Sequence, residues 1–184
     1  MPDLTRLKAS LRSAPVVDRD GYDYMVHPVT DGIPRVEPDL LREVARALAT
    51  VADLEGVDYL VTPEAMGIHH ATALSLETDL PFVVVRKRSY GLDGEVAVHQ
   101  TTGYGEDELY LNGVEAGDRV CVVDDMLSTG GTLAAVCTAL GEAGAEVVDV
   151  VTVLRRDDGI PDLPVDPSSL LRVEVVDGEV RIEE

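Results

Sequence analysis

The chain has 184 residues, of which 45% are hydrophobic, and this length suits one domain with a full hydrophobic core. Thirty-five acidic residues against fifteen basic ones give a formal net charge of −20. No basic stripe is present to meet phosphates, which argues against nucleic acid as a partner. No apolar run reaches the length of about 18 residues that a membrane span needs, so we expect no membrane partner either.

The strong acidity predicts a protein adapted to high salt. Only Lys8 and Lys87 are lysines. In dilute salt such a surface repels itself and weakens the compact state. At about 1 M salt the Debye length falls to about 3 Å, and most of this repulsion disappears. We therefore expect the protein of a halophile, such as a halophilic archaeon, and the alternative is an acidic surface that docks a basic partner.

The two cysteines, Cys121 and Cys137, fall in a predicted strand and a predicted helix. Free thiols of this kind indicate a reducing compartment rather than a disulfide scaffold. We therefore expect the protein to be cytoplasmic.

The N-terminal part is predicted to form one helix and a small irregular subdomain. Leu4, Leu7 and Leu11 follow the helical spacing, and Pro15 ends that helix. Residues 16–37 hold turn signals mixed with short apolar pieces. We therefore expect an irregular subdomain there, ahead of the main part of the fold.

From Pro38 onwards, where a helix begins, helices and strands are predicted to alternate. Residues 88–107 are interpreted as a long loop and residues 171–182 as a hairpin. Alternation of this kind favours an α/β fold with a parallel sheet flanked by helices, formed by residues 1–184 as a single domain. The apolar strands expected in this sheet cover residues 57–62, 81–85, 119–123 and 146–154.

Residues 120–132 carry the clearest functional signal. A buried strand delivers Asp124 and Asp125 to its carboxyl end, where ligands bind in open α/β sheets. Small and hydroxyl-bearing residues then lead into a helix, and the N–H groups at such a helix start suit a phosphate monoester. One Asp would suffice to cap the helix, and neither common glycine-rich nucleotide loop occurs in the chain.

Two carboxylates beside a phosphate cradle predict a ligand that has both hydroxyls and a phosphate. Each carboxylate hydrogen bond to a sugar hydroxyl would contribute roughly 1.5–3 kcal/mol. The residues predicted to hold this ligand are Asp124, Asp125, Met126, Leu127, Ser128, Thr129, Gly130, Gly131 and Thr132.

The apolar strand, the acidic pair and Ser-Thr-Gly-Gly-Thr resemble the signature for 5-phosphoribosyl-1-pyrophosphate (PRPP) in type I phosphoribosyltransferases. The chain is most similar to the archaeal purine branch, labelled hypoxanthine- or adenine-type. The resemblance implies a core of about residues 38–155 and a small hood from residues 16–37 and 160–184. It implies a purine salvage enzyme that transfers phosphoribosyl from PRPP to adenine, hypoxanthine, guanine or xanthine, releases pyrophosphate and forms a homodimer.

The resemblance also implies roles for particular residues. Mg²⁺ is expected to bridge the ligand, held mainly by ligand oxygens and water with Asp124 and Asp125 nearby as the catalytic carboxylates. Arg86-Lys87-Arg88 is the only tight basic cluster along the sequence, as an acidic protein needs for a polyanion. The implied contacts are Ala65, Met66, Gly67, Arg86 and Lys87 for pyrophosphate, and Arg88 and Tyr104 for a lid over the site.

Three positions depart from the family pattern. Ser128 replaces the Asp of hypoxanthine-guanine enzymes, Gly103 replaces a Glu of adenine enzymes, and Met66 replaces a common Arg. The general acid and base are therefore not assigned. A non-catalytic PRPP-binding regulator and an enzyme for another base, such as orotate, remain alternatives. His69 and His70 are adjacent on a predicted helix, so we expect them to face different directions.

Overall fold

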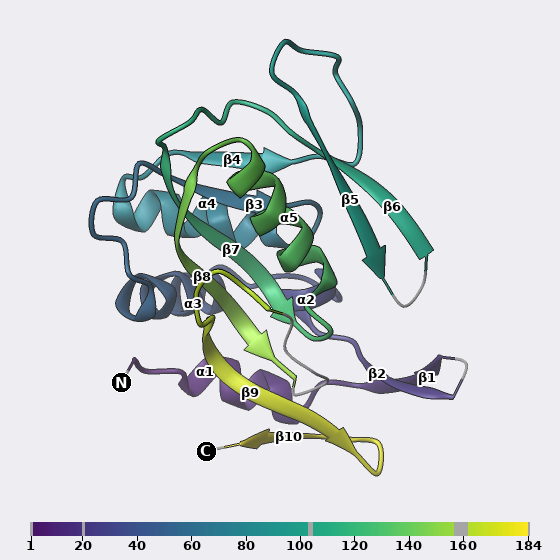
Figure 1. The fold of residues 1–184 in the computed structure, drawn as a ribbon. Coiled ribbons are helices and arrows are strands. Elements are labelled where there is room, and N and C mark those ends of the chain that lie inside the picture. Colours follow the sequence, from purple (N-terminus) through teal and green to yellow (C-terminus); the bar gives the residue numbers. More distant parts are fainter. Residues whose placement is uncertain (1, 20, 103–104, 157–161, 184) are drawn as a thin grey trace.

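The computed structural model describes residues 2–19, 21–102, 105–156 and 162–183. In this part of the chain, a six-stranded sheet forms the centre of the molecule, in the order β10-β9-β8-β7-β3-β4 (Figure 1). All neighbouring pairs are parallel except β9 and β10. The strands are β3 Tyr59–Pro63, β4 Phe82–Val85, β7 Arg119–Leu127, β8 Glu146–Arg155, β9 Ser168–Val176 and β10 Glu179–Glu183.

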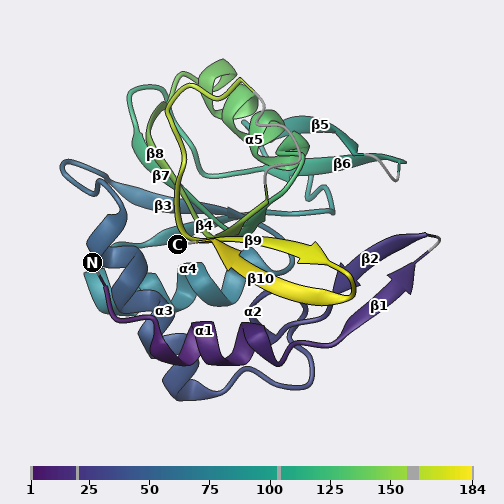
Figure 2. The ribbon, with the colours of Figure 1, turned by 90° about the horizontal axis from the view of Figure 1, so that it is seen from below.

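Helices cover both faces of this sheet, as the alternating pattern predicts (Figure 2). The two faces of β7 explain why: Cys121 and Val123 lie in the core under α1, α3 and α4, whereas Val120 and Val122 lie in the core under α5. None of the helices in the described ranges is long and apolar enough to cross a membrane. The helices are α1 Thr5–Arg12, α3 Pro38–Val51, α4 Gly67–Thr78 and α5 Gly131–Glu142.

The interpretation of residues 16–37 as irregular was wrong. This segment forms an antiparallel hairpin of β1 (Val16–Arg19) and β2 (Tyr22–Met25), followed by the short helix α2 (Pro28–Asp31). Strands of four residues are too short to show a clear alternation, so only the turn signal was visible in the sequence. In the fold, β2 contacts β9, which places the N-terminal hairpin beside the C-terminal one (Figure 2).

The interpretation of residues 88–107 as a long loop was also wrong. Strands β5 (Val96–Thr102) and β6 (Gly105–Leu111) form a second antiparallel hairpin. It buries Val98, Leu109 and Leu111 in the same core as α5. These few apolar residues stand at the two ends of a polar stretch, so their alternation was hidden.

The C-terminal hairpin was predicted, but its place in the fold was not. Strands β9 and β10 pair around Asp177 and Gly178, and β9 also pairs in parallel with β8. Within the predicted hood, residues 168–183 therefore extend the main sheet instead of lying outside it. Strand β7 also runs beyond the expected 119–123 and carries the acidic pair inside the strand.

Candidate active site

Asp124 and Asp125 lie at the carboxyl end of β7, in the middle of the sheet. Asp124 is only 8% exposed, and its Oδ1 accepts a hydrogen bond from the Asp125 backbone N–H at 2.9 Å. Burial raises the pKa of Asp124, and burial together with the adjacent Asp124 raises the pKa of Asp125 well above its ordinary value. No cation from the described residues pairs with either carboxylate. A ligand that donates hydrogen bonds to them, or that brings a cation, would therefore offset the cost of burying their charge.

The loop after β7 and the start of α5 form an open cradle of donors. The first N–H groups of α5, as in any α-helix, have no intrahelical partner. Gly130, in the left-handed region at φ 71°, precedes the helix and provides no side-chain cap for them. The hydroxyls of Ser128, Thr129 and Thr132 make no hydrogen bond to any residue that the structure describes. Such a helix start is suited to an anion.

Met126 and Leu127, which the sequence predicts to hold the ligand, belong to strand β7. The Leu127 side chain is fully buried in the core under α5, so only its backbone remains near the loop. Met126 lines a cavity beside Asp125. The loop between β7 and α5 therefore begins at Ser128.

The segment of Ala65, Met66 and Gly67 meets the acidic pair directly. A Cβ atom added to Gly67 would overlap the Thr62 hydroxyl and lie 3.0 Å from Asp124 Oδ1. The backbone of this segment can approach the carboxylate only because Gly67 has no side chain. The structure thus brings together two segments whose proximity the sequence could only suggest through a family resemblance.

Substitution of Gly67 by alanine is expected to damage both stability and the site. The new methyl group must displace Thr62 or Asp124, and such overpacking costs about 1–3 kcal/mol. We expect a lower melting temperature and weaker PRPP binding, measured by scanning and titration calorimetry. Gly141→Ala is the matched control, because Gly141 lies in α5 with no atom near its would-be Cβ. Equal behaviour of the two variants would contradict the close approach at Gly67.

Arg86 and Lys87 are fixed by Glu64 and by the β5–β6 hairpin. Arg86 Nε lies 2.9 Å from Glu64 Oε2, an ion pair whose N–H does not align as a hydrogen bond. The Lys87 backbone N–H donates to Glu64 Oε1 at 2.9 Å. Arg86 and Tyr110 exchange two backbone hydrogen bonds of 2.9 and 2.6 Å. The basic cluster therefore connects the segment before Gly67 with the hairpin.

Of the two residues predicted to form a lid, the structure describes only Arg88. The Arg88 guanidinium lies over the ring of Tyr90, 5.8 Å from its centroid. Tyr104 lies outside the described residues. The lid role of both residues stays a prediction.

A cavity of about 170 Å³ opens beside Asp125 and supplies a second part of the site. The Tyr24 hydroxyl on its wall donates to Asp31 Oδ1 at 2.7 Å. Burial, together with this hydrogen bond, raises the pKa of Tyr24 to about 12. The cavity is lined by Tyr24, Met25, Thr30, Asp125, Met126, Ser128, Arg156, Val173 and Val175.

Sequence reasoning missed Tyr24, Thr30 and Arg156 as site residues. One signal for Arg156 was available, because it follows the apolar strand β8 and so lies at the same carboxyl edge of the sheet as the acidic pair. Tyr24 and Thr30 lie in residues 16–37, which the family resemblance assigns to the hood, but no signal marks either residue individually. Their contribution depends on how the N-terminal hairpin packs against β9.

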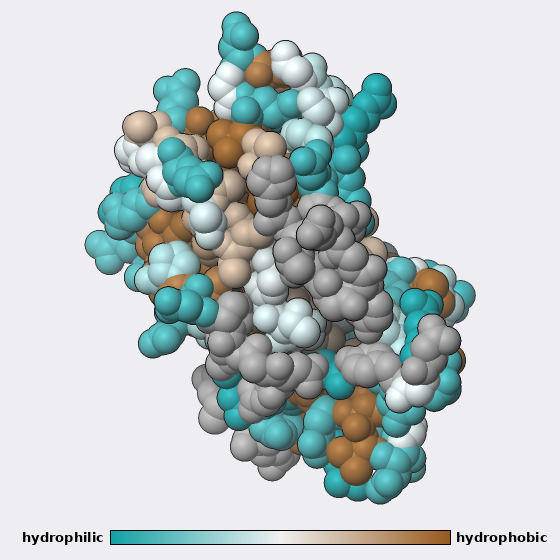
Figure 3. All heavy atoms as spheres, turned by 45° about the vertical axis from the view of Figure 1, so that its right-hand side comes forward, coloured by the Kyte–Doolittle hydropathy of each residue, from teal (hydrophilic) through white to brown (hydrophobic). Residues whose placement is uncertain are grey.

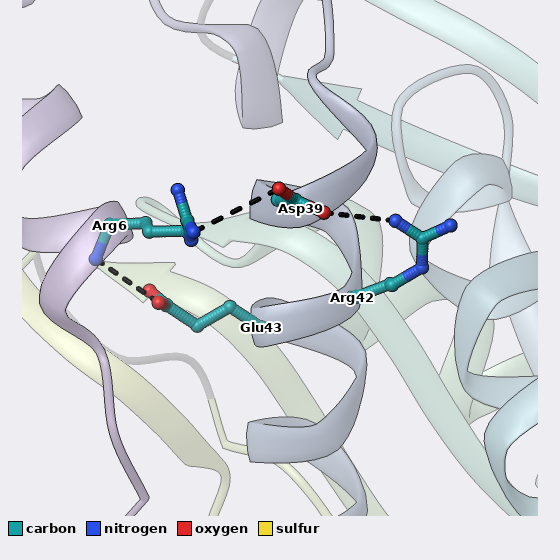
Figure 4. A network of polar contacts seen from close by, with 4 residues as sticks. All are labelled: Arg6, Asp39, Arg42 and Glu43. Carbon is teal, nitrogen blue, oxygen red and sulfur yellow. Dashed lines mark hydrogen bonds and ion pairs between the residues drawn. The ribbon is translucent and has the colours of Figure 1, made fainter.

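A larger cavity, of about 670 Å³, lies between α1 and the start of α3. Arg6, Arg35 and Arg42, which are separated in the sequence, all line it. Figure 4 shows Arg6 and Arg42 on either side of Asp39. Each arginine faces a carboxylate; Arg42, for example, donates to Asp39 at 3.0 Å. No residue of the 120–132 motif reaches this cavity, so the smaller cavity beside Asp125 is the candidate site.

The expectation that His69 and His70 face different directions was wrong. Their rings are in contact, with centroids 3.8 Å apart. Burial lowers the pKa of both imidazoles. Among the described residues, however, no group of three or more metal-binding side chains is formed.

Comparison with known proteins agrees with this geometry. A family model described as "Phosphoribosyl transferase domain" matches residues 36–174. "HGPRTase-like protein 2" of Haloterrigena turkmenica is 59% identical over 181 residues, covering 97% of this chain and 99% of that protein. "Hypoxanthine/guanine phosphoribosyltransferase" of Methanothermobacter thermautotrophicus is 55% identical over 185 residues, covering 98% of this chain and 95% of that protein.

Solved structures of phosphoribosyltransferases also match this chain. The crystal structure of adenine phosphoribosyltransferase from Thermoanaerobacter pseudethanolicus matches with a TM-score of 0.73 and 25% identity, covering 92% of this chain and 99% of that one. Adenine phosphoribosyltransferase from Saccharomyces cerevisiae matches with a TM-score of 0.71 and 25% identity, over 89% of this chain and 97% of that one. The chain therefore belongs to the phosphoribosyl transferase family, with the type I fold that its sequence resembles.

Proposed function

We propose that the protein is a cytoplasmic purine phosphoribosyltransferase that transfers phosphoribosyl from PRPP to hypoxanthine or guanine and releases pyrophosphate. The observation that carries this proposal is the cavity beside Asp125, with Arg156 on its wall. The similarity to a hypoxanthine/guanine phosphoribosyltransferase along nearly the whole chain supports it. We also propose a homodimer, which sedimentation at high salt would test against a monomer.

The roles of the residues follow from their positions. Asp124 and Asp125 accept hydrogen bonds from the ribose hydroxyls, and the cradle from Ser128 to Thr132 binds the 5′-phosphate. Arg86, Lys87 and the segment before α4 face the pyrophosphate. The base enters the cavity and attacks the anomeric carbon as pyrophosphate leaves. The protein's tasks are to align the reactants and to stabilise the departing charge.

The donor set also fits Mg²⁺. Asp124 and Asp125 are carboxylates without a cationic partner in the described chain, and Mg²⁺ prefers oxygen ligands. No third metal-binding side chain joins them among the described residues, so ligand oxygens and water would complete the coordination. When bound, Mg²⁺ would neutralise charge on the pyrophosphate.

The choice of base follows from hydrogen-bond chemistry. A guanidinium only donates, so Arg156 suits the carbonyl oxygen of a 6-oxopurine better than the amino group of adenine. Adenine is the second candidate base, because solved structures that match this chain include adenine phosphoribosyltransferases.

A product assay tests the proposed function. Protein in about 2 M KCl, where charge screening is nearly complete, is supplied with Mg²⁺, PRPP and one base at a time, and nucleotide is separated by chromatography. Product from hypoxanthine or guanine is expected. Product from adenine or orotate alone would replace the proposed base. Failure with every base, from folded protein that binds PRPP, would favour a regulator.

Arg156→Met is expected to lower kcat/KM for hypoxanthine by about 10- to 100-fold, since a charge-assisted hydrogen bond contributes roughly 1.5–3 kcal/mol. PRPP affinity should change less than kcat/KM for hypoxanthine, because the side chain of Arg156 is assigned to the base, although its backbone N–H donates to the Leu127 carbonyl beside the phosphate cradle at 2.8 Å. Arg155→Met is the matched control, because Arg155 is the last residue of β8 and does not line the cavity. Steady-state kinetics of both variants would decide, and an equal loss in the control would contradict the role of Arg156.

A further inference from the structure

The short helix α2 is held from outside by two buried histidines. A helix of four residues has almost no stability of its own. The Val29 N–H donates to His27 Nδ1 at 3.2 Å, and the Val29 carbonyl accepts from His70 Nε2 at 2.8 Å. Both polar groups of one peptide residue are thus bound by imidazoles, and the Val29 side chain is fully buried.

The chemistry of these bonds assigns the protons. A carbonyl oxygen only accepts, so His70 Nε2 carries a hydrogen. His27 Nδ1 accepts from Val29, so in the neutral ring its Nε2 donates to Ser10 Oγ at 2.9 Å. Burial lowers the pKa of His27 to about 4 and that of His70 to about 3, which keeps both rings neutral.

The held residue directly precedes two groups of the candidate site. Thr30 lines the cavity beside Asp125. Asp31 accepts hydrogen bonds from Tyr24 and from the Thr30 hydroxyl, both at 2.7 Å. A shift of Val29 would therefore move Thr30 and the Tyr24–Asp31 pair, whereas the strand that carries Asp125 would stay in the sheet.

We propose that His70 is a positioning residue for the purine base. Its bond to the Val29 carbonyl holds α2, and α2 sets the base side of the cavity through Thr30 and Asp31. Helix α4 begins at Gly67, against Asp124, and carries His70 one turn later. One helix thus supports both the acidic pair and the base pocket. The inference rests on the proposed function, since that function assigns the cavity to the base.

The test compares His70→Leu, which removes the donor, with His70→Gln, whose side-chain amide can donate to the same carbonyl. His70→Leu leaves the buried Val29 carbonyl without its donor at 2.8 Å, which is unfavourable for a buried polar group. We expect His70→Leu to raise KM for the base by about tenfold or more, with KM for PRPP nearly unchanged, and His70→Gln to restore most of the loss. If His70→Leu does not fold, His70→Asn, which is too short to reach Val29, replaces it.

Ser75→Ala is the control on the same helix. Ser75 Oγ donates to the Leu80 carbonyl at 2.5 Å, at the far end of α4 from Gly67. This variant also removes a side chain to carbonyl bond, but KM for the base should not change. An equal rise of both KM values in His70→Leu, or the same KM pattern in Ser75→Ala, would overturn the positioning role.

Hydrogen exchange separates this inference from the proposed function. The amides of Thr30, Asp31 and Gly32 donate to the carbonyls of His27 and Pro28 within α2. They should exchange faster in His70→Leu than in the wild type or Ser75→Ala. If the wild type forms nucleotide from no base, the proposed function fails, and the exchange data alone decide about His70. Unchanged exchange at these amides would overturn the inference.

Discussion

Replacement of both Asp124 and Asp125 by asparagine is expected to lower PRPP affinity at least about 100-fold and to raise the melting temperature. Two charge-assisted hydrogen bonds at roughly 1.5–3 kcal/mol each account for the loss. The gain in stability follows from the raised pKa values, because ionising these buried groups at pH 7 costs free energy that the unfolded chain does not incur. Asparagine has the same shape without the charge.

Titration and scanning calorimetry in magnesium-free buffer would measure both effects. Asp149→Asn is the matched control. Asp149 is also buried with a raised pKa, but it accepts from the Asp53 and Val150 amides at the opposite end of the strands. The control should bind PRPP like the wild type. A double variant that binds PRPP normally would contradict the site, and one that melts at a lower temperature would contradict the electrostatic account.

The melting temperature is expected to rise by roughly 10 °C between 0.2 and 3 M KCl, as about 3 kcal/mol would produce in a domain of this size. With a net charge of −20, self-repulsion dominates at low salt. Of the atoms that Figure 3 colours, many belong to hydrophilic side chains, and hydrophobic areas lie between them. The Debye length falls from about 10 Å at 0.1 M to about 3 Å at 1 M.

Scanning calorimetry across this salt range checks the expectation, and a neutral osmolyte at equal osmolality is the control. The osmolyte does not screen charge, so it should raise the melting temperature less than KCl. A melting temperature that stays flat with KCl would contradict the adaptation to salt. Binding of a basic polypeptide at low salt would then favour the docking surface instead.

Local periodicity made the main sheet and its helices predictable. Strands β3, β4, β7 and β8 are apolar runs, and the helices between them have the spacing of buried faces. The acidic pair was recognisable because charged residues at the end of a buried strand have few structural reasons to be there. These signals act over a few residues, so the sequence alone displays them.

The cavity could not be predicted in the same way. Its walls come from Tyr24, Thr30, Arg156 and Val173, which belong to four separate segments. Their meeting depends on the contact between β2 and β9, and that contact follows from the packing of two hairpins. The hairpin of β5 and β6 was missed for a related reason, because its few apolar residues are confined to the part that packs in the same core as α5. Long-range packing of this kind leaves no periodic trace in the chain.

The two backbone bonds between Arg86 and Tyr110 join the basic cluster to the β5–β6 hairpin at its root. A ligand that shifts Arg86 must therefore also strain or move strand β6. Thermodynamic linkage makes this relation mutual, so that any hairpin position favoured by a bound anion must in turn favour binding of that anion by the same factor. The pyrophosphate affinity that we propose for Arg86 would thus be a property of the hairpin as well as of the arginine.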